Sequence, residues 1–318
     1  MQNLSDRASS SRSRAVRLDA FGGPEVLSLV EAPAPQAGPG QVRVRVTAAG
    51  LNPMDWFMTA DAATAGRFGL SLPAGFGTDY AGAIDQVGDG VTGFAPGDRV
   101  FGGALSRAVA DFVVVNATGD IAANEAHHTP DGVDDRTAAT LTIAGRTACA
   151  ALVVVELGPD DTVLIGGAAG GVGVFAVQLA RIAGARVIGT GSAASADFLR
   201  DLGADPVAYG DGMVDRVRAL APRGITAAID LYGTETALAA RALGVRDARI
   251  TTIASQVDGI APANGANAAP GALETLAQRI ATGRLRVPIA ASFPVEQIRA
   301  AVELQISRHV KGKVVIDL

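Results

Sequence analysis

The chain has 318 residues, of which 48% are hydrophobic and 19% charged, and its formal net charge is −5. This composition excludes an intrinsically disordered chain, and the length predicts two domains of ordinary size rather than one small core. The acidic balance gives no general attraction to nucleic acid or to anionic membranes, so neither partner is expected. The 39 glycines and the low aromatic content of 4% favour an α/β enzyme with many tight turns.

Two features of the sequence bear on its cellular location. Cys149 is the only cysteine, which excludes an intramolecular disulfide and indicates a reducing, cytoplasmic compartment. Its predicted role is that of a small buried hydrophobe rather than a nucleophile. Residues 1–14 are rich in Ser and Arg and contain no apolar segment. They are predicted to form a disordered tail, with a transit peptide as the alternative, and not a secretory signal.

Between residue 15 and about residue 115 the pattern is typical of short β-strands. Residues 41–47 alternate strictly, with Val42, Val44 and Val46 on one face and arginines on the other, which predicts a half-exposed strand. Turn signals rich in Gly and Pro punctuate this region at residues 38–40, 88–90 and 96–98. The first third of the chain is therefore predicted to be a compact, twisted β domain.

Beyond about residue 140 the pattern changes to alternating strands and helices, which predicts βαβ units and a parallel sheet. Strands are expected at residues 162–166, 186–190, 226–231 and 249–254. Helices are expected at residues 172–183, 195–202, 272–282 and 295–305, with a loop at residues 259–271. A terminal strand at residues 313–317 is expected to rejoin the first domain.

Residues 162–180 carry no charge over 19 positions, which approaches the length of a bilayer-spanning segment. Glycines in the middle of this stretch predict a strand, a turn and a helix instead. The turn, Ala168-Ala169-Gly170-Gly171-Val172-Gly173, has the AxGxxG form of the dinucleotide fingerprint. Its glycines let the backbone approach a pyrophosphate, whose charge is stabilised by free N–H groups at the helix N-terminus. The alternative is a turn that serves packing alone.

The second strand of this unit ends in Thr190-Gly191-Ser192-Ala193, where an NAD-dependent enzyme normally has an acidic residue for the adenosine ribose. An acid there would repel a 2′-phosphate, whereas the hydroxyl of Ser192 is able to donate a hydrogen bond to one. The sequence therefore favours NADPH as the cofactor. No Lys or Arg lies next to this strand end in the sequence, which leaves NADH as the alternative.

Several short motifs occur in order along the chain. They are residues 50–55 (GLNPMD), 77–82 (GTDYAG), 96–102 (PGDRVFG), 147–148 (TA), 168–173 (AAGGVG), 202–205 (LGAD) and 312–315 (GKVV). From Ala15 to Leu318 the chain resembles the medium-chain dehydrogenase/reductase superfamily, specifically its zinc-free, zeta-crystallin-like quinone oxidoreductase branch. The resemblance implies a GroES-like β-rich catalytic domain, at residues 15–141 and 283–318. It also implies a Rossmann domain with a doubly wound parallel sheet, at residues 142–282.

The resemblance also implies that no metal is bound. Zinc-dependent members have a Cys where this chain has Asn52, and a His-Glu pair where it has Thr78 and Asp79. His127 and His128 are adjacent and would point apart on any regular element, so a surface loop is expected rather than a ligand pair. Without a metal Lewis acid, a conjugated acceptor is favoured, because its developing charge spreads onto an oxygen that hydrogen-bond donors can stabilise.

Further site residues follow from the resemblance. Asn52 is expected beside the nicotinamide and the substrate, where it would orient the reaction. Trp56, Phe57 and Tyr80 are expected to line the substrate pocket. Asp79 and Tyr80 are candidate proton donors, with water as the alternative. The remaining cofactor contacts are expected at Thr147 for the carboxamide, Ser192 and Tyr209 for the adenosine phosphate, and Ile253, Ala254 and Ser255 for the nicotinamide ring.

The leading functional prediction is reduction of a quinone or an α,β-unsaturated ketone by hydride from NADPH, in a homodimer without zinc. A second is an enoyl-thioester or other biosynthetic enoyl reductase, with a longer acyl chain between the domains. A third is a protein that binds NADPH as a structural or regulatory ligand without turnover, because likeness of fold does not establish catalysis.

Overall fold

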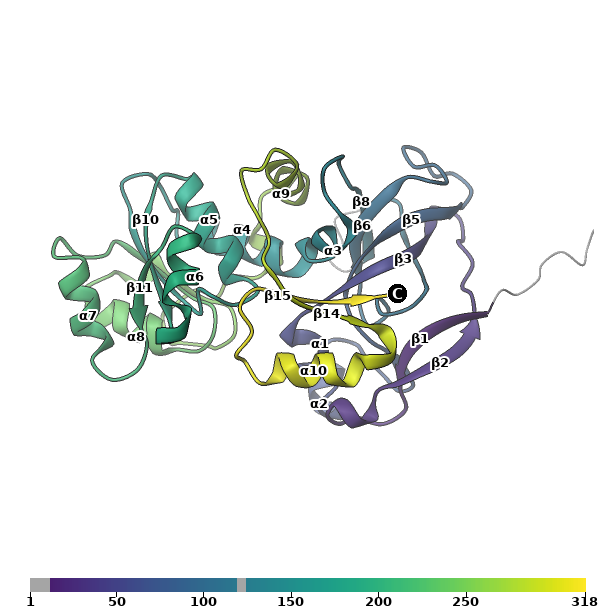
Figure 1. Ribbon diagram of the computed structural model, residues 1–318, viewed down its shortest axis with the longest axis horizontal. Helices are drawn as coiled ribbons and strands as arrows, with labels where there is room; N and C mark the ends of the chain where they lie inside the picture. The colour runs from purple at the N-terminus through teal and green to yellow at the C-terminus, as the bar shows by residue number, and fades with distance from the viewer. Residues whose placement is uncertain (1–11, 119–123) are drawn as a thin grey trace, which may run out of the picture.

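The computed structural model describes residues 12–118 and 124–318 of the chain. Figure 1 shows two bodies side by side, one rich in β-strands and one in which helices surround a parallel sheet. The first and the last described strands both belong to the β-rich body. The predicted α/β class with a parallel sheet is confirmed.

The main sheet of the β-rich body has the strand order β14-β15-β3-β5-β6-β8-β7. Its strands are β3 (Gln41–Leu51), β5 (Asp79–Val87), β6 (Arg99–Ala104), β7 (Phe112–Asn116), β8 (Asn124–His128), β14 (Ile289–Pro294) and β15 (Lys313–Asp317). Strand β3 also pairs with β7, so the run from β3 to β7 closes on itself as a barrel. Val42, Val44 and Val46 are buried inside it, as their alternation predicts.

The predicted N-terminal tail is three residues too long, because strand β1 (Arg12–Leu18) begins at Arg12. This strand pairs with β2 (Ser28–Pro33) and β4 (Ala74–Gly75) in a small second sheet. Arg14 is held further by an ion pair of 3.0 Å with Asp111. Backbone pairing and this ion pair outweigh the polar composition of residues 12–14. The rest of the predicted tail, residues 1–11, lies outside the described residues.

The end of the chain returns to the β-rich body. Strand β15 pairs antiparallel with β3, with Val314 opposite Leu51 and Asp317 opposite Ala48. Strand β14, which the sequence analysis did not predict, lies parallel to β15. Helix α10 (Ile298–Ile306) connects them. The last strand therefore starts next to the residue at which β3 ends, and this brings residues about 260 positions apart into contact.

The second body contains a five-stranded parallel sheet in the order β11-β10-β9-β12-β13. Its strands are β9 (Thr162–Gly166), β10 (Arg186–Gly191), β11 (Asp205–Ala208), β12 (Ala227–Asp230) and β13 (Ile250–Thr252). The helices between them are α5 (Gly173–Ile182), α6 (Ala196–Asp201), α7 (Met213–Leu220) and α8 (Glu235–Ala242). The uncharged stretch thus forms a strand, a turn and a helix, as predicted. No helix in the described ranges is long and apolar enough to span a bilayer.

Further helices and turns complete the fold. The other α-helices are α1 (Pro53–Phe57), α2 (Ala62–Arg67), α3 (Asp135–Ala138), α4 (Arg146–Val154) and α9 (Ala272–Ala281). A π-helical turn (Leu141–Gly145) precedes α4, and 3₁₀ turns occur at Pro24–Val26, Ala193–Ser195, Asp247–Arg249, Gly265–Asn267 and Val295–Gln297. Cys149 on α4 packs against the main core, and burial raises the pKa of its thiol to about 11. This agrees with its predicted packing role.

The prediction that His127 and His128 lie on a surface loop is wrong, because both belong to strand β8. Successive side chains of a strand point to opposite faces, and His128 stacks on Phe94 with ring centres 4.5 Å apart. His127 faces inward, where Nδ1 lies 2.7 Å from Oε1 of Glu274 on α9 and Nε2 lies 3.3 Å from Oε2 of Glu125. The imidazole therefore joins the barrel to the helix that follows the parallel sheet.

This contact makes stability depend on pH. Burial opposes the charge on His127, but hydrogen bonds and charge interactions with Glu125 and Glu274 outweigh burial and raise the pKa of the imidazole. Stabilisation by a group with a raised pKa is complete below its unfolded pKa of about 6.5 and is lost as pH rises through the folded pKa. We expect His127→Gln to lower the free energy of unfolding by about 1 kcal/mol more at pH 6 than at pH 8.5, in chemical denaturation.

The matched control is His128→Gln, whose ring bonds to the carbonyl oxygen of Gly93 at 2.9 Å. This variant measures the effect of losing an imidazole that contacts a carbonyl oxygen rather than carboxylates. An effect of His127→Gln that does not change with pH would contradict the assignment of the charge.

Candidate active site

Several of the predicted cofactor residues follow strands at one edge of the parallel sheet. Because the five strands are parallel, their carboxyl ends share that edge. There β9 leads into the glycine turn, β10 into Ser192, β11 into Tyr209 and β13 into Ile253. The carbonyl oxygen of Ser255 accepts a hydrogen bond of 2.6 Å from Thr252, which fixes the loop after β13. In doubly wound sheets, this is the edge at which nucleotides bind.

The positions of the glycine turn between β9 and α5 differ in how closely the backbone approaches a side chain. A Cβ on Gly173 would lie 2.4 Å from two backbone carbonyl oxygens at the start of the turn, so only glycine fits there. A Cβ on Gly170 would meet a single carbonyl oxygen at 3.3 Å. Among the residues that the structure describes, the N–H groups of Gly171 and Val172 have no hydrogen-bond partner. These free amides at the start of a ten-residue helix fit a pyrophosphate group.

The neighbouring strand β12 ends in Asp230, whose carboxylate is buried. It accepts hydrogen bonds of 2.8–3.1 Å from the backbone N–H groups of Tyr232, Gly233, Thr236 and Ala237. These bonds satisfy the first amides of α8 and hold the turn that carries Tyr232. The ring of Tyr232 is 60% exposed at the same edge of the sheet.

Asn52 lies between the end of β3 and the start of α1 and is 2% exposed. Its side-chain Nδ2 donates to Oδ2 of Asp79 at 3.0 Å, and its Oδ1 accepts from Nζ of Lys313 at 2.6 Å. Its backbone N–H donates to Oδ2 of Asp55 at 2.8 Å. Because an ammonium group only donates hydrogen bonds and an ionised carboxylate only accepts them, the two partners fix the orientation of the amide. A side-chain hydrogen bond from Asn52 also acts on Asp55, where it opposes the rise in the pKa of that carboxyl group.

The carboxylates of Asp55 and Asp79 are buried beside this amide. Thr78 donates to Asp55 at 2.7 Å, and the backbone N–H of Ile143 donates to Asp79 at 3.1 Å. Burial raises the pKa of Asp79 to about 7 and that of Asp55 to about 6, against the opposing effects of Lys313 and of their hydrogen bonds. Burial also lowers the pKa of Lys313. Two carboxyl groups thus share one ammonium, and the cluster gains or loses a proton near neutral pH.

The side chain of Lys313 connects this cluster to the glycine turn. A Cβ on Gly171 would lie 3.2 Å from Cδ of Lys313, so the lysine stem passes directly over the turn. The backbone N–H of Gly312 donates to the carbonyl oxygen of Ala169 at 2.9 Å. Beyond the turn, Nζ of Lys313 also donates to the carbonyl oxygen of Leu51 at 3.1 Å. Asn52 and the glycine turn come from different bodies, and one buried lysine spans both.

Aromatic side chains from the two bodies meet around Arg308. Its guanidinium carbon lies 5.6 Å from the ring centre of Trp56 and 5.0 Å from that of Tyr232, within the range of cation–π contacts. Trp56 is half-buried and donates from Nε1 to Gln305 at 3.1 Å. Phe57 is 49% exposed. The predicted pocket role of Trp56 and Phe57 stays a prediction.

The prediction that Tyr80 lines the pocket is wrong. Tyr80 is fully buried inside the barrel, among Val42, Val44 and Val100. Its hydroxyl donates to the carbonyl oxygen of Glu125 at 2.9 Å, and burial raises the pKa of the phenol. Tyr80 therefore packs the barrel and is not placed to donate a proton to a substrate.

At the positions where zinc-dependent enzymes have ligands, this chain has a hydrogen-bonded network. Asn52 and Asp79 bond to each other, and Thr78 bonds to Asp55. Within residues 12–118 and 124–318, no group of three or more His, Cys, Asp or Glu side chains is arranged to hold a metal ion.

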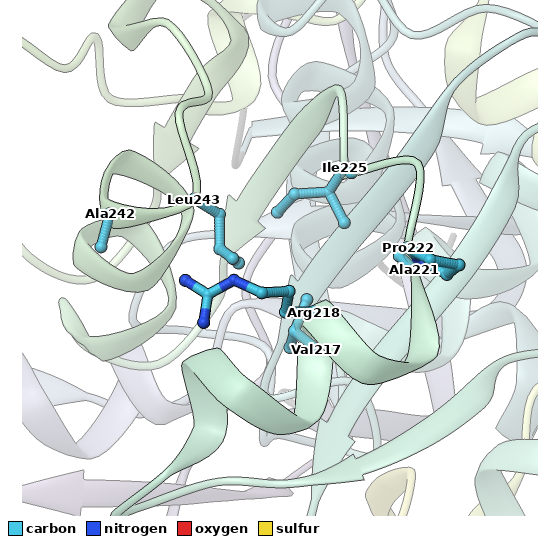
Figure 2. Close-up of a pocket in the computed structure, with 8 residues that line it drawn as sticks. Val217, Arg218, Ala221, Pro222, Ile225, Ala242 and Leu243 are labelled. Atoms are coloured by element: carbon cyan, nitrogen blue, oxygen red, sulfur yellow. The ribbon is translucent and has the colours of Figure 1, made fainter.

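A separate groove of about 300 Å³ lies between α7 and α8 (Figure 2). Val217, Ile225 and Leu243 are among the residues that line it. Ile225 precedes β12, so the groove lies at the amino end of that strand, away from the glycine turn. It contains no predicted site residue.

Sequence reasoning missed the side chains that join the two bodies, which are Lys313, Arg308 and Tyr232. The composition of the chain sets Lys313 apart. The chain has 25 arginines and only two lysines, Lys311 and Lys313, separated by a single glycine. Because the ammonium of Lys and the guanidinium of Arg are not interchangeable, these two lysines are distinct from the other cations of the chain.

The comparisons with known proteins agree with this architecture. Residues 38–176 match the alcohol dehydrogenase GroES-like domain, and residues 171–267 match the zinc-binding dehydrogenase family. The quinone oxidoreductase complexed with NADPH from Escherichia coli superposes with a TM-score of 0.84 at 25% identity, over 96% of this chain and 100% of that chain.

Sequence relatives cover the central part of the chain. A quinone oxidoreductase from Rattus norvegicus is 40% identical over 184 residues, which is 56% of this chain and 52% of the relative. The spectinabilin polyketide synthase system protein NorB of Streptomyces orinoci is 41% identical over 198 residues, which is 59% of this chain and 8% of NorB. The match therefore spans about half the length of the quinone oxidoreductase relative. The chain therefore combines a GroES-like alcohol dehydrogenase domain with a nucleotide-binding domain of the zinc-binding dehydrogenase type, and it is similar to quinone oxidoreductases.

Proposed function

We propose that the protein is a zinc-independent oxidoreductase that uses NADPH to reduce a quinone or an α,β-unsaturated ketone. The observation that carries the proposal is the bridge made by Lys313. Its ammonium bonds to Asn52 at 2.6 Å while its stem crosses the glycine turn at Gly171. A polar donor group is thus held next to a nucleotide-binding turn, which is the arrangement that hydride transfer to a carbonyl compound needs.

The residues at the edge of the parallel sheet fit a dinucleotide. The free amides of Gly171 and Val172 would bind its pyrophosphate, and Ser192 and Tyr209 would lie at its adenosine end. Thr147, half-buried in α4, and the loop with Ile253, Ala254 and Ser255 would contact the nicotinamide. The E. coli relative was solved with NADPH, and no acidic residue follows β10 here. When bound, NADPH supplies the hydride.

Asn52 has the geometry of an oriented hydrogen-bond donor. Lys313 binds its Oδ1 and Asp79 accepts from its Nδ2, so the amide is held in one orientation. A donor held in one orientation pays no reorganisation energy when negative charge develops on an oxygen. We assign Asn52 this role toward the carbonyl oxygen of the substrate.

The same network supports independence from zinc. A metal ion bound at Asn52 would lie close to the ammonium of Lys313. Two positive charges this close repel each other strongly in a buried site. Asn52 also replaces the thiolate that zinc prefers. We expect activity to be unchanged by a chelator and elemental analysis to find no stoichiometric zinc.

Enoyl reduction is the second candidate function, and the match to the polyketide synthase protein NorB favours it. Quinones, enones and enoyl thioesters all accept hydride at carbon while charge spreads to an oxygen, so the site chemistry is shared. The difference lies in how much of the substrate extends beyond the reacting carbons. A third candidate, NADPH binding without turnover, predicts a bound cofactor that no acceptor oxidises.

One assay separates these functions. NADPH absorbance at 340 nm is followed in the presence of a series of quinones, enones and enoyl thioesters. We expect turnover with quinones or enones at a higher kcat/KM than with the thioesters. A higher kcat/KM for thioesters would replace the proposal by enoyl reduction, and tight NADPH binding without any turnover would support the third candidate.

The glycine turn provides a test of cofactor binding. Gly170→Val adds a branched side chain to the turn at which a pyrophosphate should bind, so the Kd of NADPH and of NADH should rise more than about thirtyfold. Because its Cβ would lie 3.3 Å from the carbonyl oxygen of Gly167, the Tm of the apo variant is measured as well. Gly173→Ala is the matched control, because its Cβ clashes with backbone and should lower the apo Tm instead. Unchanged cofactor binding by Gly170→Val would remove the main support for the proposed function.

The buried ammonium provides a test of the network. Lys313→Met should lower the free energy of unfolding by about 2–4 kcal/mol at pH 8, because Asp55, Asp79 and Asn52 lose their buried cation. The loss should be smaller at pH 6. Both carboxyl groups have raised pKa values, so the folded variant takes up protons that replace the missing charge as pH falls.

Chemical denaturation at the two pH values measures this difference, with Lys311→Met as the control. Lys311 is half-exposed and should not affect stability at either pH. An equal loss for Lys313→Met at pH 6 and pH 8 would show that the aspartates do not exchange protons with the cluster.

A further inference from the structure

The loop after β10 has no charge of its own. Residues 190–196, which follow the strand and form the 3₁₀ turn before α6, contain neither an acid nor a base. The nearest charged residues on α6, Asp197 and Arg200, bind each other at 2.6 Å. Recognition of a 2′-phosphate at this strand end usually needs a basic side chain, so a cation has to come from elsewhere in the fold.

Lys311 supplies a cation at this loop. Its Nζ donates to the carbonyl oxygen of Ala194 at 2.5 Å, across a separation of 117 residues. The backbone N–H of the next residue, Gly312, donates to the carbonyl oxygen of Ala169 in the glycine turn. This bond fixes the position of Lys311 relative to the carboxyl edge of the parallel sheet. Only one of the three N–H groups of the ammonium is used by Ala194, and the side chain is half-exposed.

Other polar groups at the loop lie near Lys311 and would contact a 2′-phosphate bound there. The hydroxyls of Ser192 and Ser195 lie 3.0 Å apart, and these residues flank Ala194, whose carbonyl oxygen Lys311 contacts, in the chain. Gly191 pairs with Ala208 in the sheet, which brings Ser192 and Tyr209 to adjacent strand ends. The anion would therefore meet a hydroxyl and an ammonium on one side and an exposed phenol ring on the other.

Another cation of this region, Arg216, is already occupied. The guanidinium of Arg216 donates to the backbone carbonyl oxygens of Ala208, Tyr209, Gly210 and Asp211 at 2.7–3.2 Å. These bonds hold the loop after β11 and use the donor groups of the arginine. Lys311 is thus a basic side chain near Ser192 whose ammonium has N–H groups available for an anion.

We propose that Lys311, together with Ser192, binds the 2′-phosphate of NADPH and determines the preference for NADPH over NADH. The inference rests on the proposed function, because it names the residue that discriminates between the two cofactors at the same site. A phosphate carries about two negative charges at neutral pH, whereas NADH has a neutral hydroxyl at this position. An ammonium group therefore favours NADPH selectively, and it comes from the C-terminal segment of the β-rich body rather than from the Rossmann body.

The test uses cofactor binding, measured by calorimetric titration of the full chain with NADPH and with NADH. We expect Lys311→Met to raise the Kd of NADPH at least about tenfold and to change the Kd of NADH less than twofold. Lys311→Arg should keep most of the preference, because it retains the charge. The apo Tm should be unaffected, since the lysine makes one surface hydrogen bond.

Two controls make the result specific. Arg200→Met removes a nearby cation whose charge is already paired with Asp197, and it should leave both Kd values unchanged. Titration with 2′,5′-ADP and with 5′-AMP probes the adenosine end alone, and Lys311→Met should weaken only the ligand with the 2′-phosphate.

The outcomes separate the inference from the function on which it rests. An equal rise in the Kd of NADPH and of NADH on Lys311→Met would overturn the inference, because the lysine would then only maintain the conformation of its segment. A wild-type protein that binds both cofactors equally would overturn it as well. A wild-type protein that binds neither would overturn the proposed function itself.

Discussion

A buried ammonium group joins the two bodies of this protein. Lys313 is 2% exposed, and hydrogen bonds to Leu51 and Asn52 and the nearby charges of Asp55 and Asp79 offset part of its desolvation, which still lowers its pKa. Without these partners a lysine at this depth would lose its proton or move to the surface. The glycine turn is subject to the same constraint, because a side chain at Gly171 would press against the lysine stem.

The path of the C-terminal segment explains how one lysine reaches both bodies. After α10 the chain passes the glycine turn at the carboxyl edge of the parallel sheet, and it then pairs with β3 as β15. Gly312 is required in this passage, since its φ is +97° and a Cβ would lie 2.2 Å from the carbonyl oxygen of Pro288. Three side chains of this segment make contacts at the junction. Arg308 contacts Trp56 and Tyr232, Lys311 contacts the loop after β10, and Lys313 contacts Asn52. A short stretch of sequence thus organises contacts along the whole junction.

Local patterns predicted the elements well and their long-range partners poorly. The alternation of β3 and the glycine turn of β9 and α5 depend on neighbouring residues, so periodicity and turn chemistry were sufficient. The bond from Lys313 to Asn52 joins residues 261 positions apart, and no local pattern records it. The error at Tyr80 has a related cause. Asp79 and Tyr80 are neighbours on β5, but strand geometry sends Asp79 toward Asn52 and Tyr80 into the barrel.

On the proposed function, the network sets which acceptors the enzyme is able to reduce. An amide N–H stabilises a developing oxyanion by a few kcal/mol, which is less than a divalent metal ion contributes. A simple ketone places the full charge on one oxygen and depends on that stronger stabilisation. A quinone or enone delocalises the charge over its conjugated system and needs less from the protein. A site built on Asn52, with its orientation fixed by Lys313 and Asp79, is therefore suited to conjugated acceptors, because the substrate provides the stabilisation that the metal would otherwise supply.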